Sequence, residues 1–260
     1  MRFSPTLLLI LLMQRTLTYP TTSELQVQRE RRIIGGEPAR IEQVPYLVNI
    51  RLNRLFHCGG SLVTSRCVLT AAHCISHHLP NDFVVRGGNT LLSDVENWRT
   101  VKRVFVPPEY NNRTFDHDVA IMRLNTKLQG VNIKPITIGD FALAQGEYVT
   151  VSGWGLTREN AVLPSNHMQT VRLHVLEQKQ CKAIYGDYRN VTDTMFCASV
   201  PGQKDACLAD SGGPAVARGR LVGVVSWGKG RECGRANSPG VYVRLNMVKK
   251  WLMHILYKHC

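Results

Sequence analysis

The stretch Ala209–Ala215, which reads Ala-Asp-Ser-Gly-Gly-Pro-Ala, is the part of this chain that says most about its fold and chemistry. Its serine, Ser211, stands between an acidic residue and two glycines, and glycines let backbone N–H groups approach closely. Converging N–H groups stabilise a developing oxyanion. Although Gly-Gly-Pro also suits any tight turn, the stretch is typical of a loop that presents a nucleophilic hydroxyl.

Two other segments supply the groups that such a serine needs. A serine hydroxyl needs a base within hydrogen-bond reach, and the base needs a group that fixes its tautomer. Thr70–Cys74 contains His73 as a base, and Asp116–Ala120 contains Asp118 as an acid. Because the chain holds nine histidines and 19 acidic residues, a trio could arise by chance, and the flanking residues carry the specificity.

Residues 1–19 are predicted to be a signal peptide. Arg2 is followed by an apolar run from Leu7 to Met13, which suits a secretory signal and is too short to span a bilayer. We therefore expect no stable membrane insertion, with an uncleaved signal anchor as the alternative.

Residues 20–32 are predicted to be an activation propeptide. The segment is polar, should be accessible to a protease, and ends in Arg29-Glu30-Arg31-Arg32. An apolar residue, Ile33, follows at once. Cleavage after Arg32 is expected, by a trypsin-like activator or by a proprotein convertase, and residues 33–260 would form the remaining domain.

The net charge of the chain is +13. Five basic and two acidic residues precede Ile33, so the rest keeps 27 basic and 17 acidic residues, a net charge of +10. Such a field attracts anionic glycans or acidic substrates. Because the basic residues are scattered and do not alternate with aromatic ones, we expect solvated surface and no nucleic-acid binding.

Eight cysteines lie between residues 58 and 260, and an even number after a signal peptide indicates disulfides formed in an oxidising compartment. Sequons at Asn112 and Asn190 predict glycosylated surface loops. Together these features favour a secreted, extracellular glycoprotein.

Short apolar runs separated by Gly, Pro and Asn predict an all-β fold, a sandwich or a pair of barrels. The runs are Tyr46–Leu52, Ser61–Thr70, Asp82–Arg86, Val101–Val106, Val119–Leu124, Tyr148–Ser152, Met168–Leu176, Leu221–Ser226 and Gly240–Leu245. The end of the chain differs, because apolar residues from Val248 to Leu256 recur at helical spacing after Asn246, a predicted N-cap. This helix should dock on the β core.

At this point the chain resembles the trypsin/chymotrypsin-like serine endopeptidases. The resemblance runs from Ile33 to about Leu256, and its markers occur in the family's order. They are Ile33–Gly36, Thr70–Cys74, Asp118–Ala120, Gly153–Gly155, Asp210–Pro214 and Ser226–Gly228. The resemblance implies two six-stranded antiparallel β-barrels, a C-terminal helix and an active site between the barrels.

The same resemblance implies a role for each site residue. His73 would be the general base and acid, Asp118 would orient it, and Ser211 would be the nucleophile. Ser226 would hydrogen-bond near Asp118, and the backbone of Ser226–Gly228, including Trp227, would pair with the substrate as an added strand. After cleavage, the α-amine of Ile33 would pair with Asp210 and order the loop that carries Ser211.

Substrate specificity is predicted from Asp205. In the family, an acid six residues before the reactive serine lies at the base of the primary pocket and pairs with Arg or Lys of the substrate. Gly228 and Gly240 match the pocket walls, and Ala206 replaces a hydroxyl present in many relatives, which favours Arg over Lys. Phe115 would make the neighbouring subsite apolar.

Three disulfides are implied by the resemblance: Cys58–Cys74, Cys181–Cys197 and Cys207–Cys233. Cys67 and Cys260 are left over, and a bridge between them, free thiols or a bond from Cys260 to another chain remain open. No cofactor is expected. No metal is expected either, because Gly87–Asn97 holds only Asp94 and Glu96 as carboxylates.

Ala209 departs from the family pattern. Relatives have glycine there, and the N–H of that residue joins the N–H of Ser211 in the oxyanion hole. A Cβ at this position costs about 1 kcal/mol or more if the backbone geometry suits only glycine. Two function classes follow: an active secreted endopeptidase, or a catalytically weak or silent homologue that binds or regulates other proteins.

The partners expected for the active enzyme are protein substrates with Arg or Lys at the cleaved position, an activating protease and protein inhibitors. The chain is expected to be a monomer.

Overall fold

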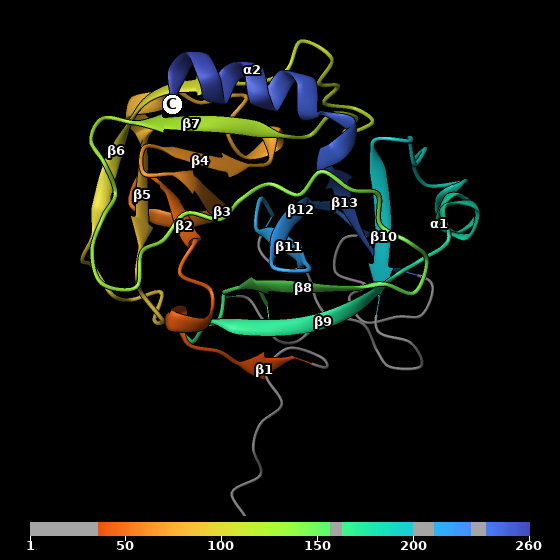
Figure 1. Cartoon of the computed structure of the whole chain (residues 1–260), viewed down its shortest axis with the longest axis horizontal. Helices are drawn as coiled ribbons and strands as arrows, with labels where there is room; N and C mark the ends of the chain where they lie inside the picture. The colour runs from red at the N-terminus through yellow and green to blue at the C-terminus, as the bar shows by residue number, and fades with distance from the viewer. Residues whose placement is uncertain (1–35, 157–162, 200–210, 230–237) are drawn as a thin grey trace, which may run out of the picture. The chain divides into compact units, whose positions relative to one another are not determined.

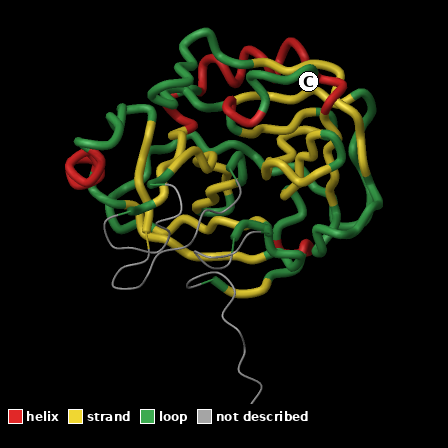
Figure 2. The backbone as a smooth tube through the Cα atoms, turned by 180° about the vertical axis from the view of Figure 1, so that it is seen from behind, coloured by secondary structure: helices red, strands yellow, loops and turns green. Residues whose placement is uncertain are grey.

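The computed structural model describes residues 36–156, 163–199, 211–229 and 238–260. Within these ranges the strands form two closed antiparallel β-barrels of six strands each, which confirms the predicted fold class. The barrels lie beside each other, and both can be followed from the front and from behind (Figures 1 and 2).

The first barrel is closed in the order β2-β3-β4-β7-β6-β5. Its strands are β2 (Leu47–Leu52), β3 (Leu55–Thr64), β4 (Cys67–Thr70), β5 (Phe83–Gly87), β6 (Trp98–Phe105) and β7 (Ala120–Leu124). The 3₁₀ turns η2 (Ala72–Cys74) and η3 (Pro80–Asp82) lie between β4 and β5, and η1 (Ile41–Gln43) precedes β2.

The second barrel runs β9-β10-β13-β12-β11-β8 and closes because β8 also pairs with β9. Its strands are β8 (Tyr148–Gly153), β9 (Gln169–Val175), β10 (Met195–Ser199), β11 (Pro214–Ala217), β12 (Arg220–Trp227) and β13 (Gly240–Arg244). The short β1 (Glu37–Pro38) pairs with the free edge of β9, and helix α1 (Gln178–Tyr185) connects β9 to β10.

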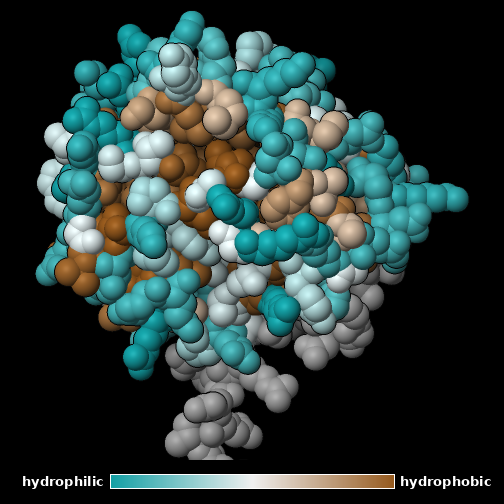
Figure 3. Space-filling model, viewed as in Figure 1, coloured by the Kyte–Doolittle hydropathy of each residue, from teal (hydrophilic) through white to brown (hydrophobic). Residues whose placement is uncertain are grey.

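Alternating burial shows how two of the strands are oriented. In β5 every second residue from Phe83 is buried, and β9 shows the same pattern from Gln169, so each strand turns one face to a barrel interior. Apolar clusters fill both barrels, and the first cluster also contains Leu221, Val224 and Val243 of the second barrel. The barrels therefore pack against each other through apolar side chains. On the outside, apolar side chains show between polar ones (Figure 3).

Helix α2 (Lys249–His259) docks on the first barrel, next to β7 (Figure 1). Leu252 and Ile255 are buried in the cluster of that barrel, and Cys260 is bonded to the buried Cys67 of β4. Docking of this helix was expected, but the predicted N-cap Asn246 is wrong. Asn246 lies inside the 3₁₀ turn η4 (Leu245–Met247), and Val248 occupies the cap position without a side-chain hydrogen bond.

Most of the predicted runs coincide with strands, and one is corrected. Ser61–Thr70 is not a single strand, because Ser65 and Arg66 form a turn between β3 and β4. Among the described residues, the longest helix has 11 residues, and none is long and apolar enough to cross a membrane.

Candidate active site

The pairing of β4 with β7 brings His73 and Asp118 together. Thr70 of β4 pairs with Ala120 of β7, so the residues after β4 lie next to the residues before β7. The backbone N–H of His73 donates to Asp118 Oδ1 at 2.8 Å, and His73 Nδ1 lies 2.7 Å from Asp118 Oδ2. Both contacts orient the imidazole ring.

The Asp118 carboxylate is fully buried and accepts hydrogen bonds from the backbone and the ring of His73 and from Ser226. Its relative exposure is 0%, and Ser226 of β12 donates its hydroxyl to Asp118 Oδ2 at 2.5 Å. A buried carboxylate is costly unless it accepts such hydrogen bonds. Because the Asp118 carboxylate accepts a hydrogen bond from His73 Nδ1, the neutral imidazole carries its proton on Nδ1. Its Nε2 is therefore a hydrogen-bond acceptor.

Ser211 is anchored to the first barrel by its backbone. The Gly59 N–H donates to the Ser211 carbonyl at 2.9 Å, and the Gly212 N–H donates to the Val225 carbonyl at 2.8 Å. The Cys74 sulfur lies 3.7 Å from the Ser211 carbonyl oxygen and 3.7 Å from His73 Nε2. The Ser211 carbonyl oxygen and His73 Nε2 are therefore at most twice 3.7 Å apart.

No hydrogen bond joins the Ser211 hydroxyl to His73 Nε2, although both residues are described. Nucleophile–base hydrogen bonds are often loose without substrate and tighten in the reacting complex. The structure therefore places the backbone of Ser211 near His73 and Asp118, and the described residues show no hydrogen bond between the Ser211 hydroxyl and His73.

Gly212 fits its position because it has no side chain. Its φ is +83°, a conformation that residues with a Cβ rarely adopt, and a Cβ there would collide with Thr70 Oγ1 and the Gly59 carbonyl oxygen. Thr70 Oγ1 itself donates to that carbonyl at 2.8 Å. Gly212, next to Ser211, therefore packs directly against Thr70 and Gly59 of the first barrel.

Asp116 forms a second polar centre, which the sequence reasoning missed. It accepts hydrogen bonds from the hydroxyls of Thr192 at 2.7 Å and Thr194 at 2.5 Å, and from the His117 N–H at 3.1 Å. Burial alone would raise the pKa of Asp116, but the bonds from Thr194 and Thr192 and the nearby His117 outweigh it and lower the pKa. The network ties the loop before Asp118 to the second barrel.

His57 and His78 lie next to each other, near His73. His57 Nε2 lies 2.9 Å from the Cys74 carbonyl oxygen, and its ring centre lies 5.9 Å from that of His78. Burial lowers the pKa of His57 despite the bond to Cys74, and the nearby His78 and His73 lower it further. This favours a neutral His57.

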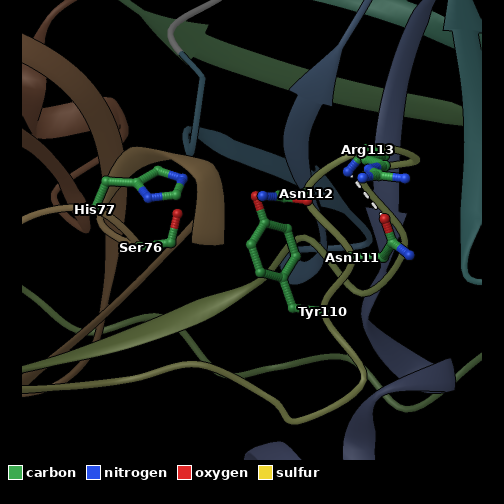
Figure 4. A pocket seen from close by; sticks show the side chains of 6 residues that line it. All are labelled: Ser76, His77, Tyr110, Asn111, Asn112 and Arg113. Carbon is green, nitrogen blue, oxygen red and sulfur yellow. Dashed lines mark hydrogen bonds between the residues drawn. The ribbon is translucent and has the colours of Figure 1, made fainter.

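A polar pocket lies between two loops of the first barrel. It is lined by Ser76 and His77 on one side and by Tyr110, Asn111, Asn112 and Arg113 on the other (Figure 4). Burial raises the pKa of Tyr110, as does the charge of Asp118. The Arg113 N–H donates to Asn111 Oδ1 at 2.9 Å, which shapes the loop. The sequon residue Asn112 is exposed here, and the second sequon residue, Asn190, is exposed elsewhere.

The described residues offer one group of metal-ligand atoms, and it does not suit a metal. Cys58, His73 and Cys74 place such atoms within 4.8 Å of one another. The two sulfurs form the Cys58–Cys74 disulfide, so neither is a thiolate, and His73 Nδ1 is bound to Asp118.

The structure gives positions for part of the predicted specificity and disulfide residues. Trp227, the last residue of β12, pairs with Val241, so Gly228 follows β12 near Gly240, the first residue of β13. Cys58–Cys74, Cys181–Cys197 and Cys67–Cys260 are bonded. The other predicted site residues lie outside the described residues; these are Arg32, Ile33, Asp205, Ala206, Cys207, Ala209, Asp210 and Cys233.

Comparisons with known proteins agree with this arrangement. The family model described as Trypsin matches residues 33–252. Seminase of Drosophila melanogaster is 37% identical over 226 residues, which cover 86% of this chain and 82% of that protein. Trypsin alpha of Drosophila melanogaster is 35% identical, over 87% of this chain and 88% of its own. Trypsin epsilon of Drosophila erecta is 36% identical, over 86% of this chain and 88% of its own length.

Proposed function

Because this chain belongs to the trypsin family and is a serine endopeptidase, we propose that it cleaves protein substrates after Arg, and less readily after Lys, by a Ser211–His73–Asp118 triad. We propose further that it is secreted as a zymogen and activated by cleavage after Arg32. The observation that carries the proposal is the buried Asp118 carboxylate, which is bonded to both the backbone and the ring of His73.

The proposed reaction begins at Ser211. Its Oγ attacks the scissile carbonyl carbon while His73 Nε2 takes the hydroxyl proton. The resulting imidazolium is stabilised by Asp118 through the Nδ1 contact, and it then gives the proton to the departing amine as the C–N bond breaks. Water then attacks the acyl carbon while His73 Nε2 takes its proton, and the histidine returns this proton to Ser211 Oγ as the bond between Oγ and the acyl carbon breaks.

The oxyanion of each tetrahedral intermediate would be held by the backbone N–H groups of Ala209 and Ser211. Losing one such donor costs roughly 100-fold or more in rate. Alanine keeps the N–H but adds a Cβ, so we expect an active enzyme whose rate depends on the backbone conformation at Ala209.

Specificity is proposed to come from Asp205, whose carboxylate would bind the guanidinium or ammonium group of the substrate residue. The adjacent positions of Gly228 and Gly240 support this proposal, because neither glycine has a side chain to block a long substrate residue. Ala206 supplies no hydroxyl, which favours Arg over Lys, since a guanidinium forms a bidentate pair and an ammonium relies on extra partners.

Activation is proposed to follow cleavage after Arg32. The new α-amine of Ile33 would pair with Asp210, next to the nucleophile, and this pair would fix the Ser211 loop. The basic sequence Arg29–Arg32 also fits a proprotein convertase, which would make the activating cut inside the secretory pathway.

The test combines labelling and turnover. Full-length protein cleaved after Arg32 should hydrolyse an arginyl amide substrate, and a fluorophosphonate should label Ser211. Uncleaved protein and the Ser211→Ala variant should do neither. Absence of labelling after cleavage would overturn the enzymatic proposal and leave the binding or regulatory homologue. Secretion of Arg32→Gln still beginning at Ile33 would overturn the activation site.

A further inference from the structure

The guanidinium of Arg189 lies over aromatic rings beside the candidate site. Its Cζ is 4.2 Å from the ring centre of Phe115, 5.0 Å from that of Trp227 and 5.9 Å from that of Tyr188. The Phe115 ring lies 5.4 Å from the ring of His73. Aromatic faces attract cations, so these rings hold a positive charge close to the histidine.

The backbone and its surroundings hold Arg189 in this position. The Arg189 N–H donates to the Tyr185 carbonyl at 2.9 Å. Tyr185 is buried, its ring centre lies 4.8 Å from that of Trp227, and its hydroxyl donates to the Pro239 carbonyl. Arg189 itself is half-buried, so the residue is not enclosed by the protein.

Arg189 takes no part in the ion pairs of the described residues. Those pairs join Lys182 to Asp193, Arg218 to Glu147, Lys249 to Asp140, His73 to Asp118 and His117 to Asp116. A guanidinium that is oriented by rings and keeps donors available binds a carboxylate in bidentate fashion. Little conformational entropy remains to be lost on binding, because the stacked group is already oriented.

We propose that Arg189 is a specificity-determining residue that selects substrates with an acidic side chain at one position before the cleaved arginine or lysine, the position whose side chain turns toward its guanidinium. The inference rests on the proposed function, because it takes the substrate to pair with the backbone of Ser226–Gly228. A strand placed there runs past Trp227 and Phe115, and alternate side chains of a strand point to the same face. One of these faces turns toward the guanidinium of Arg189.

The first experiment compares peptide arginyl amides that differ only by Glu or Gln at each position before the arginine in turn. With protein cleaved after Arg32, kcat/KM should be about twofold to fivefold higher for Glu at one position, the range of a partly exposed ion pair. The preference should decrease at about 1 M NaCl, where charges are screened within a few ångströms.

Variants then assign this preference to one side chain. Arg189→Gln should reduce the Glu/Gln ratio to about one, and Arg189→Glu should reverse it. Arg172→Gln is the matched control: Arg172 also stacks on a ring, 4.0 Å from the centre of Tyr148, but belongs to β9, which supplies none of the site residues. This variant removes the same charge and should leave the ratio unchanged.

A binding measurement separates this inference from the proposed function. In the Ser211→Ala background, calorimetry should give a lower Kd for the Glu peptide than for the Gln peptide, whether or not the native enzyme turns either over. Absence of turnover with this difference intact would count against the proposed function alone. Equal Kd values, or a preference that survives Arg189→Gln, would overturn the role of Arg189.

Discussion

The two barrels contribute to the site in different ways. The first barrel supplies His73 and Asp118, which the β4–β7 pairing brings together and which bond directly through their side chains. The second barrel supplies Ser211, whose described anchors are backbone hydrogen bonds and a close contact at Gly212. The proposed base is thus positioned within one barrel, while the proposed nucleophile is positioned by contacts with both barrels.

The substitution Asp118→Asn would disrupt the contact between Asp118 and His73 that is built within the first barrel. An amide can donate to His73 Nδ1, which stabilises the wrong tautomer and no longer stabilises the imidazolium. We expect kcat to decrease about 10⁴-fold, as for a triad that loses its carboxylate. Steady-state hydrolysis of an arginyl amide measures it. Asp140→Asn, the same change at an exposed carboxylate, is the control, and an equal loss there would contradict the role of Asp118.

Removing the Cys67–Cys260 bridge tests whether the first barrel needs its covalent connection to α2. The double variant Cys67→Ala/Cys260→Ala should lose about 2–5 kcal/mol of unfolding free energy, since the unfolded chain regains entropy. Urea denaturation followed by fluorescence measures the loss. The kcat/KM value should stay near that of the native enzyme, and a large decrease would show that α2 positions the site.

Gly212→Ala would break the contact across the barrels. A Cβ at a φ of +83° collides with Thr70 Oγ1 and the Gly59 carbonyl oxygen, so the Ser211 loop must shift. A shift of about 1 Å at a reacting group costs on the order of 100-fold in rate. The rate of fluorophosphonate labelling measures this. Gly219→Ala shares a positive φ, +68°, with no atom within 4 Å of its Cβ, and should label normally.

Asp116→Asn sharpens the comparison, because Asp116 links the Asp118 loop to the second barrel. Losing its charge weakens the bonds from Thr192 and Thr194 and should cost about 1–2 kcal/mol of unfolding free energy near pH 7. Folding lowers the pKa of Asp116, so its contribution is fully present above about 3.9 and is lost as the pH falls through the folded pKa. Denaturation curves should therefore converge in acid, and a constant difference would contradict this.

The sequence predicts the fold well where its signals are local. Short apolar runs separated by Gly, Pro and Asn mark nine strand regions, and flanking motifs single out His73, Asp118 and Ser211. The sequence does not predict β11 or α1. Strand β11 begins at Pro214 inside an apparent turn, and α1 buries only Cys181 and Tyr185, which is too few apolar residues to form a recognisable helical pattern.

The contacts that depend on distant residues could not be predicted from the sequence. Asp116 looks like a flanking residue until the fold places Thr192 and Thr194 against it. Arg189 looks like one scattered cation among many until α1 sets it over Phe115. In both cases the partner is selected by the way the barrels pack, and no local pattern encodes that packing.

The disulfide between Cys67 and Cys260 spans 193 residues, so the result of a proteolytic cut depends on where in the chain it falls. A single cut anywhere between these two cysteines leaves both fragments covalently joined, so an enzyme that nicks its own loops remains one molecule. Residues 1–32 contain no cysteine, and a cut after Arg32 releases them completely. On a non-reducing gel, cleavage after Arg32 should therefore remove mass, whereas a single cut between Cys67 and Cys260 should become visible only after reduction.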